Sequence, residues 1–353
     1  MSGFCLWPGR APGLVLLVAL AGCVRPALDY SPPPATDLDG RWTEYLTTLD
    51  GIPLQEACRP VRRAPPAGTP VRGAVLMLHG FNACTQQYEE LAGFLADEGF
   101  VALGPLLPGH GRLNPAVNQD DTRDLSTPRT WEADYGAFVR RMNDMMAAAE
   151  GERVIVGLSV GSATAIYALL QDRELYDRGL LFVPYLGMPG GAAATAVAGV
   201  VGRIPVLRET SVGALGWRGI CVPKRKAGRA GYCDYRFKHV VAINRLGAAA
   251  RGGAAAEPLT LPLQIVPLSN DAAVSERRLR EFIAAGAGGD TSRVCVYPEG
   301  VPHSMLSRAD HPGEDMYWLD AVFAATVDFV VNRQYFPLAE GAPRLDLGPE
   351  CRI

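Results

Sequence analysis

The sequence predicts an α/β fold with a mostly parallel central sheet flanked by helices. Short apolar segments at residues 73–78, 100–103 and 153–157 alternate with segments whose apolar residues recur at helical spacing. Continuously apolar strands indicate a sheet that is covered on both faces. Their alternation with helices indicates parallel strands joined by right-handed crossovers.

The expected elements follow one another from residue 73 to residue 331. The predicted strands cover residues 73–78, 100–103, 153–157, 179–185, 261–268 and 293–297. The predicted helices cover residues 87–96, 130–149, 162–170, 274–285 and about 314–331. Thr130 is the expected N-cap of the second of these helices, because its hydroxyl can accept from a free backbone amide.

One interval interrupts the alternation. About 75 residues separate the predicted strands at 179–185 and 261–268, whereas such connections usually hold two to six residues. We expect residues 188–258 to form a lid or cap over the carboxyl ends of the strands, where open α/β sheets bind ligands. This insertion includes an apolar piece at 192–201. A loosely ordered surface excursion is the alternative.

The charge of the chain is unevenly distributed. Residues 203–239 hold nine Lys and Arg residues against Glu209 and Asp234, whereas the whole chain has a net charge of −3. The basic segment is either a solvated surface or a face that attracts anionic lipids or substrates. With 48% hydrophobic and 20% charged residues, the composition is that of a globular chain and argues against a nucleic-acid partner.

The N-terminus indicates export. Residues 1–22 carry one charge, Arg10, and an apolar run that is too short for a membrane span of about 20 residues, so they predict a secretory signal peptide. The segment Leu20-Ala21-Gly22-Cys23 resembles the lipobox of bacterial lipoproteins. That resemblance implies cleavage before Cys23 and acylation of its sulfur and new amino group, with palmitate or a similar chain. An ordinary cleaved signal or an N-terminal anchor helix is the alternative.

The rest of the chain divides into three predicted parts. Residues 23–40, with the run Ser31-Pro32-Pro33-Pro34, predict an extended tether, residues 41–345 a globular domain and residues 346–353 a C-terminal tail. Acyl chains on Cys23 would hold the domain at a membrane. Because Val24 rather than an aspartate follows Cys23, we expect the periplasmic side of the outer membrane rather than the inner membrane.

Cysteine usage agrees with export. The chain has eight cysteines, of which six remain once Cys5 leaves with the signal peptide and Cys23 is acylated. An even number in an oxidising compartment indicates disulfides, and the expected pair is Cys221–Cys233, which brackets a short basic loop. Buried free thiols are the alternative. No Cys or His cluster has the spacing of zinc ligands, so we expect no metal and no other cofactor.

The segment Gly157-Leu158-Ser159-Val160-Gly161 lies between a predicted strand and a predicted helix. A G-x-S-x-G motif in this position is typical of a serine nucleophile on a sharp turn, where small neighbours avoid clashes. The turn presents the hydroxyl of Ser159 above the sheet. The amide of Val160, at the start of the helix, is an expected donor to the negatively charged oxygen that forms during acyl transfer.

A serine nucleophile requires a base and an acid that orients the base. His303 and Asp271 each follow a predicted strand and should therefore lie at the same sheet edge as Ser159. The order Ser159, Asp271, His303 is that of α/β-hydrolases. His311 and Asp290 are the alternatives for the base and the acid.

The loop after the first predicted strand completes the expected site. In Leu78-His79-Gly80-Phe81-Asn82, Gly80 allows the backbone to approach a substrate, and the amide of Phe81 is the expected second oxyanion donor. His79 is expected to support this loop and not to act as the base.

Several motifs together resemble a known family. They are His79-Gly80-Phe81, Leu107-Pro108-Gly109-His110-Gly111, Trp131 and Gly157–Gly161. Their spacing resembles the carboxylesterase and monoacylglycerol-lipase branch of the α/β-hydrolase superfamily, closely over residues 73–187 and more loosely over 260–335. The cap and the continuation Gly111-Arg112-Leu113-Asn114 differ from that branch.

The resemblance implies a serine hydrolase that cleaves small-molecule esters or lipids through an acyl-enzyme, without a cofactor. It assigns the catalytic triad to Ser159, Asp271 and His303, and the oxyanion amides to Phe81 and Val160. A thioesterase or amidase with the same fold is one alternative. A lipoprotein that binds envelope components without catalysis is the other.

Overall fold

The computed structural model describes residues 37–352 apart from 117–118, 190–199, 201–203, 213–216, 286–288 and 342–346. The predicted signal peptide, the lipidation site Cys23 and nearly all of the apolar piece at 192–201 lie outside the described residues. Among the helices of the described residues, none combines the length and the apolar character that crossing a membrane requires.

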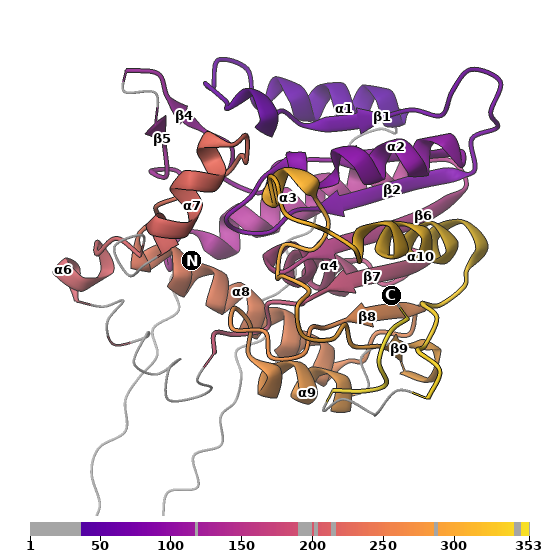
Figure 1. The fold of residues 1–353 in the computed structure, drawn as a ribbon. Helices are drawn as coiled ribbons and strands as arrows, with labels where there is room; N and C mark the ends of the chain where they lie inside the picture. Colours follow the sequence, from indigo (N-terminus) through magenta and orange to yellow (C-terminus); the bar gives the residue numbers. More distant parts are fainter. Residues whose placement is uncertain are drawn as a thin grey trace, which may run out of the picture. The chain divides into compact units, whose positions relative to one another are not determined.

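A seven-stranded sheet forms the centre of the fold, in the order β1-β3-β2-β6-β7-β8-β9 (Figure 1). The first edge strand, β1 (Val61–Arg63), is antiparallel to β3 (Phe100–Gly104), and all other pairs are parallel. The remaining strands are β2 (Gly73–Leu78), β6 (Glu152–Leu158), β7 (Arg178–Phe182), β8 (Leu263–Val266) and β9 (Arg293–Val294). The predicted α/β class with a mostly parallel sheet is confirmed.

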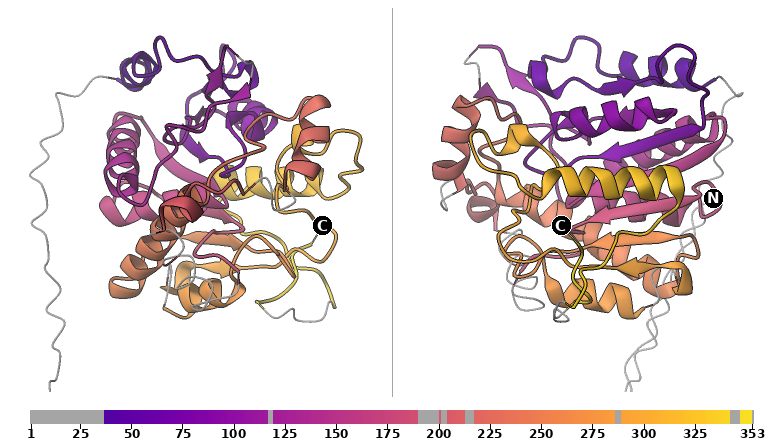
Figure 2. Two further views of the ribbon diagram at one scale, coloured as in Figure 1. Left: turned by 90° about the vertical axis from the view of Figure 1, so that its left-hand side faces the viewer. Right: turned by 45° about the vertical axis from the view of Figure 1, so that its right-hand side comes forward.

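Helices cover both faces of this sheet (Figure 2). Side chains alternate along β6, so that Ile155 joins one buried cluster while Val154 and Val156 join the other. The cluster of Val154 includes side chains of α2 (Glu89–Asp97) and α10 (Leu319–Asn332). The cluster of Ile155 includes side chains of α1 (Leu38–Thr47), α3 (Trp131–Ala147), α4 (Val160–Gln171), α8 (Phe237–Ala256) and α9 (Glu276–Ala284).

Two predictions at helix ends are wrong. Helix α1 begins at Leu38, inside the predicted tether of residues 23–40, because the side chain of Asp37 caps it by accepting from the Gly40 amide at 2.7 Å. Thr130 precedes α3 but does not cap it. Its hydroxyl instead accepts from the backbone amide of Thr127 at 3.0 Å, within the preceding turn.

The long interval between β7 and β8 contains two different parts. Helix α8 buries Leu246, Ala250 and Ala254 in the same cluster as α4, so it belongs to the layer that flanks the sheet. Before it come the short helices α6 (Pro205–Arg208) and α7 (Trp217–Lys226). Described residues before α8, such as Val212 and Lys224, line the same cavity as Phe237 and Val240 in the first turn of α8.

Three disulfides join the six cysteines of the described chain: Cys58–Cys84, Cys221–Cys233 and Cys295–Cys351. The second is the pair that the sequence favoured. The third fixes the predicted C-terminal tail, whose Glu350 also forms a parallel bridge with Val296 beyond β9. A two-stranded hairpin, β4 (Leu113–Asn114) and β5 (Gln119–Asp120), was not expected from the sequence.

Candidate functional site

Ser159 occupies a strained turn between β6 and α4. Its backbone angles, φ 57° and ψ −114°, are unusual for a residue with a side chain. A Cβ atom on Gly161 would lie 1.8 Å from the carbonyl oxygen of Leu78, and one on Gly157 would lie 2.5 Å from Cα of Ser162. Only glycine fits at these two positions, so the sequence forces the tight turn that presents Ser159.

The end of β7 holds this turn through the backbone. The amide of Ser159 donates to the carbonyl of Phe182 at 2.9 Å, and the amide of Tyr185 donates to the carbonyl of Ser159 at 3.1 Å. The hydroxyl of Ser162 donates to Phe182 as well, at 2.8 Å. The position of Ser159 is therefore determined by main-chain contacts to the neighbouring strand.

His303 and Asp271 form a hydrogen-bonded pair at the carboxyl edge of the sheet. Nδ1 of His303 donates to Oδ2 of Asp271 at 2.7 Å. The Asp271 side chain is only 5% exposed, and its other oxygen accepts from the amide of Ala273 at 2.8 Å. Ser275, not Asp271, caps the following helix α9. With its proton on Nδ1, the ring of His303 leaves Nε2 available to accept a proton.

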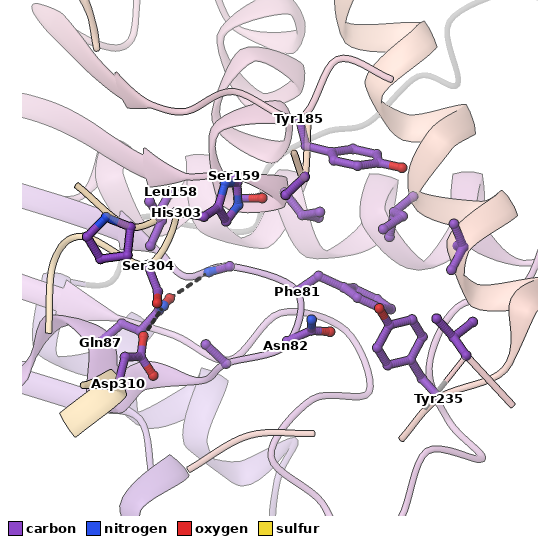
Figure 3. A pocket seen from close by; sticks show the side chains of 18 of the residues that line it. Phe81, Asn82, Gln87, Leu158, Ser159, Tyr185, Tyr235, His303, Ser304 and Asp310 are labelled. Atoms are coloured by element: carbon purple, nitrogen blue, oxygen red, sulfur yellow. Dashed lines mark hydrogen bonds between the residues drawn. The ribbon is translucent and has the colours of Figure 1, made fainter. Parts of the chain in front are cut away.

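Ser159 and His303 line the same cavity, which has a volume of about 600 Å³. In Figure 3 their labelled side chains lie next to each other on its wall. Within the described part of the chain, the Ser159 hydroxyl makes no hydrogen bond to His303. Contacts of this kind often tighten only when a substrate is bound.

The cavity has an apolar side and a polar side. The apolar side is formed by Tyr185, Met188, Val212, Tyr235, Phe237, Val240 and Ile243. The polar side is formed by Gln87, Lys224, Arg229, Ser304, Asp310 and His311. The cations here are engaged within the protein, since Lys224 pairs with Glu314 at 2.7 Å and Arg229 with Asp310 at 3.1 Å.

The Gly80 loop, residues 80–82, forms part of the cavity wall, and most of its backbone polar groups are engaged. The Gly80 amide donates to Oε1 of Gln87 at 2.9 Å, and the Gly80 carbonyl accepts from Nδ1 of His79 at 2.8 Å. Nε2 of His110 donates to the Phe81 carbonyl at 2.9 Å. Arg229 donates to the Asn82 carbonyl at 2.9 Å.

Both histidines beside this loop are neutral at neutral pH. Burial lowers the pKa of His79 to about 3, and burial likewise lowers the pKa of His110 to about 4. His79 keeps a single ring proton for the Gly80 carbonyl, because its Nε2 accepts from the Leu107 amide at 3.1 Å. As the sequence predicted, His79 supports the loop.

Among the cavity amides that have no acceptor in the described part of the chain, two are placed to bind an oxyanion. They are those of Phe81 and Val160, and both residues line the cavity together with Ser159. The amide of Val160 is also the first of helix α4, where the helix dipole favours negative charge. These two amides are the pair that the sequence assigned to the oxyanion.

The alternative residues do not form such an arrangement. His311 lines the cavity, but Nε2 donates to the Ser304 carbonyl at 2.8 Å and Nδ1 lies 2.7 Å from Glu314. Asp290 is exposed in a short 3-10 helix before β9. Among the described residues, no group of three His, Cys, Asp or Glu residues is arranged to hold a metal ion. Sequence reasoning missed Gln87, Arg229 and Asp310, which no motif marks.

Comparisons with solved structures agree with this fold. The monoacylglycerol lipase of Paleococcus ferrophilus has a TM-score of 0.56 and 17% identity, over 78% of this chain and 98% of that one. A soluble variant of monoglyceride lipase from Saccharomyces cerevisiae has a TM-score of 0.55 and 15% identity, over 79% and 92%. A thermostable carboxyl esterase from Bacillus coagulans has a TM-score of 0.56 and 14% identity, over 77% and 93%.

No curated protein matches the sequence. A family model, Hydrolase_4, described as serine aminopeptidase S33, matches residues 69–308, which is more than half of the chain and includes Ser159, Asp271 and His303. The chain therefore belongs to the Hydrolase_4 (serine aminopeptidase, S33) family and has the α/β-hydrolase fold.

Proposed function

We propose that this protein is a serine hydrolase of carboxylic esters that is anchored by lipid in the cell envelope. The catalytic part of the proposal rests on the hydrogen bond between His303 and the buried Asp271. His303 lines the same cavity as Ser159, which has strained backbone angles. A base that is oriented by an acid, next to a serine that lines a cavity, is the arrangement that nucleophilic acyl transfer requires.

In the proposed mechanism, Ser159 Oγ attacks the ester carbonyl carbon while Nε2 of His303 takes the hydroxyl proton. The carbonyl electron pair moves to the oxygen, which the amides of Phe81 and Val160 stabilise. When the tetrahedral intermediate collapses, the alcohol leaves with the proton from His303, and an acyl-enzyme remains. Water then attacks the acyl group by the same steps and releases the acid. Asp271 stabilises the charged imidazole during both steps.

The cavity favours an ester with an apolar acyl group. The side chains of its apolar side, among them Tyr185 and Ile243, provide aromatic and aliphatic surface in the cavity that Ser159 lines. Structures named as lipases and esterases share the fold, which supports this substrate class. An aminopeptidase substrate would bring a charged amino group. The only acidic side chain among the described lining residues, Asp310, is already paired with Arg229, so an ester is favoured over a peptide.

The proposed location rests on the N-terminal sequence. Cleavage after residue 22 and acylation of Cys23 would anchor the enzyme, with the periplasmic side of the outer membrane as the expected place. Three disulfides are consistent with an oxidising compartment. A palmitate analogue should label the wild type but not Cys23→Ala, and that variant should leave the membrane fraction. Equal labelling of both proteins would contradict the anchor.

The catalytic proposal is tested by turnover of p-nitrophenyl esters of increasing chain length and by labelling with a fluorophosphonate. Ser159→Ala should abolish both. Asp271→Asn should lower kcat by about 10³-fold, because His303 loses the partner that fixes its tautomer. Asp290→Asn is the matched control and should behave as the wild type. Full turnover in Ser159→Ala would exclude this mechanism, and a wild type that neither turns over esters nor reacts with the phosphonate would favour a binding protein.

A further inference from the structure

A buried ion pair lies beside the cavity and plays no part in the mechanism above. Nε of Arg229 is 3.1 Å from Oδ1 of Asp310, and the two side chains are only 4% and 3% exposed. Arg229 follows α7 in the long interval before α8, whereas Asp310 ends a 3-10 helix seven residues after His303. Burying two charges costs desolvation energy that their attraction often only offsets, so stability alone does not explain this pair.

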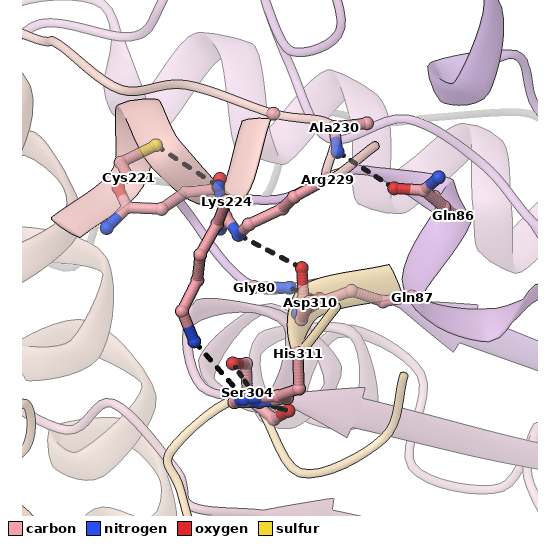
Figure 4. A network of polar contacts seen from close by, with 12 residues as sticks. Gly80, Gln86, Gln87, Cys221, Lys224, Arg229, Ala230, Ser304, Asp310 and His311 are labelled. Atoms are coloured by element: carbon pink, nitrogen blue, oxygen red, sulfur yellow. Dashed lines mark hydrogen bonds and ion pairs between the residues drawn. The ribbon is translucent and has the colours of Figure 1, made fainter. Parts of the chain in front are cut away.

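The ion pair, which Figure 4 shows, is connected to both ends of the Gly80 loop through hydrogen bonds. The other oxygen of Asp310 accepts from Nε2 of Gln87 at 2.6 Å, and Oε1 of Gln87 accepts from the Gly80 amide at 2.9 Å. Arg229 itself donates to the Asn82 carbonyl at 2.9 Å. The amide of Phe81, which is free to bind an oxyanion, lies between these two fixed ends.

The residues after Arg229 pack directly on the same loop. A Cβ atom on Gly231 would lie 2.3 Å from the Asn82 carbonyl oxygen, so the two backbones approach closely. The Tyr232 amide donates to that carbonyl at 3.2 Å, and the Ala230 amide donates to Gln86 at 2.8 Å. The disulfide Cys221–Cys233 closes the chain on both sides of Arg229. This segment therefore forms a fixed contact with the Gly80 loop.

We propose that Arg229, acting through Asp310 and Gln87, is a positioning residue for the oxyanion amide of Phe81. The segment around Arg229 then sets the geometry of the reaction as well as lining the cavity. This inference rests on the proposed function, because the amide matters only in acyl transfer. An amide that is displaced from the oxyanion weakens binding of the transition state more than binding of the ester, so kcat falls while KM is retained.

The test uses the variant Arg229→Met/Asp310→Leu, which removes both charges and leaves neither buried alone. We expect a 10- to 100-fold loss of kcat with KM within about twofold of the wild type, somewhat less than the loss of a whole donor. Affinity for a trifluoromethyl ketone, which forms a tetrahedral adduct with the serine, should fall by the same factor. Affinity for the alcohol product should not change. Arg229→Lys, which keeps the charge, should recover part of the kcat.

The control is Arg251→Met/Glu281→Leu, which removes an ion pair of 2.8 Å between α8 and α9, away from the cavity, together with the ion pairs of Glu281 to Arg277 and Arg278 within α9. It should keep the kcat and the ketone affinity of the wild type. If the Arg229/Asp310 variant is folded, as shown by cooperative unfolding, and keeps the kcat and the ketone affinity of the wild type, the inference is wrong although the proposed function stands. A parallel rise in KM and fall in kcat would likewise overturn it. If the wild type shows no ester turnover, the proposed function fails first, and the catalytic role of Arg229 fails with it.

Discussion

Two neighbouring parts of the cavity wall, the turn at Ser159 and the Gly80 loop, are held by different kinds of contact. The turn at Ser159 is fixed by the main chain, through the close approach of Gly161 to Leu78 and the hydrogen bond of Ser159 to Phe182. The Gly80 loop is fixed by side chains from four separate segments: His79, Gln87, His110 and Arg229.

This difference determines how each part responds to change. A substitution of Gly157 or Gly161 meets backbone that cannot move without disturbing the sheet, so the fold itself should fail. A substitution at one support of the Gly80 loop removes one of several contacts, so the fold should survive while the geometry of the Phe81 amide changes. Substitutions of the turn glycines are thus expected to abolish folding, whereas substitutions at the supports of the Gly80 loop are expected to change kcat by degrees.

The strongest test of this contrast is Gly161→Ala. The added Cβ atom would lie 1.8 Å from the Leu78 carbonyl oxygen, and neither backbone can yield. We expect the free energy of unfolding to fall by more than about 4 kcal/mol, with loss of ester turnover. Denaturant unfolding followed by circular dichroism measures this change.

Gly252→Ala provides the matched control. Gly252 lies in helix α8 with no atom within 4 Å of an added Cβ, so the substitution should leave turnover intact and raise stability by up to about 1 kcal/mol. If Gly161→Ala were as stable and active as this control, the turn would not be held by backbone contact.

The same contrast explains what the sequence could and could not predict. Ser159, Asp271 and His303 each follow a strand, so an alternating strand pattern was enough to bring them to one edge. The supports of the Gly80 loop come from distant positions: Gln87 is 223 residues from Asp310. No periodicity links residues so far apart, and a buried Arg or Gln looks like a surface residue in the sequence.

The failures of sequence prediction at helix ends have a local cause. A Thr before a helix predicts a cap, but Thr130 has a competing donor in the Thr127 amide, three residues earlier. Whether the Thr130 hydroxyl accepts from the Thr127 amide or from an amide of the helix depends on the backbone angles of the turn. The residue types alone do not determine these angles. The basic segment 203–239 was similarly ambiguous. Lys224, Arg229 and Lys238 turn out to be ion-paired within the protein.

Two disulfides allow the effect of the Gly80 loop on kcat to be tested separately from the stability of the fold. Cys221–Cys233 spans 12 positions around Arg229, whereas Cys295–Cys351 spans 56 and ties the C-terminal segment to the sheet edge. In the chain-entropy model, their removal costs about 3 and about 4 kcal/mol respectively. We expect Cys221→Ala/Cys233→Ala to lower kcat beyond its effect on stability, because Arg229 loses a constraint. Thermal unfolding and ester turnover at 25 °C measure the two effects.

Cys295→Ala/Cys351→Ala is the comparison for this experiment. It should lose more stability but keep the kcat of the folded enzyme, since neither cysteine lines the cavity. Equal losses of kcat in both variants would show that the loop responds to stability alone and not to the position of Arg229.

A smaller effect should appear in the pH dependence of the free energy of unfolding. Buried histidines lie beside the Gly80 loop, whereas the turn at residues 157–162 contains no ionisable side chain. Burial lowers the pKa of His79 to about 3, and that of His110 and His239 to about 4. In the unfolded chain each titrates near 6.5. Below pH 6.5 the unfolded state therefore binds more protons than the folded state, so stability must fall as the pH is lowered toward 4.

The variant His239→Gln isolates one of these contributions. His239 contacts the carbonyl of Ser126 and does not line the cavity, so its replacement should leave turnover unchanged. Between pH 6.5 and 5.5, the wild type should lose about 1 kcal/mol more stability than the variant, since one proton per pH unit is worth about 1.4 kcal/mol. Urea unfolding at the two pH values measures the difference. If both proteins lost the same stability, His239 would not be buried in its neutral form. The acid sensitivity would then have to come from other groups, such as His79 and His110.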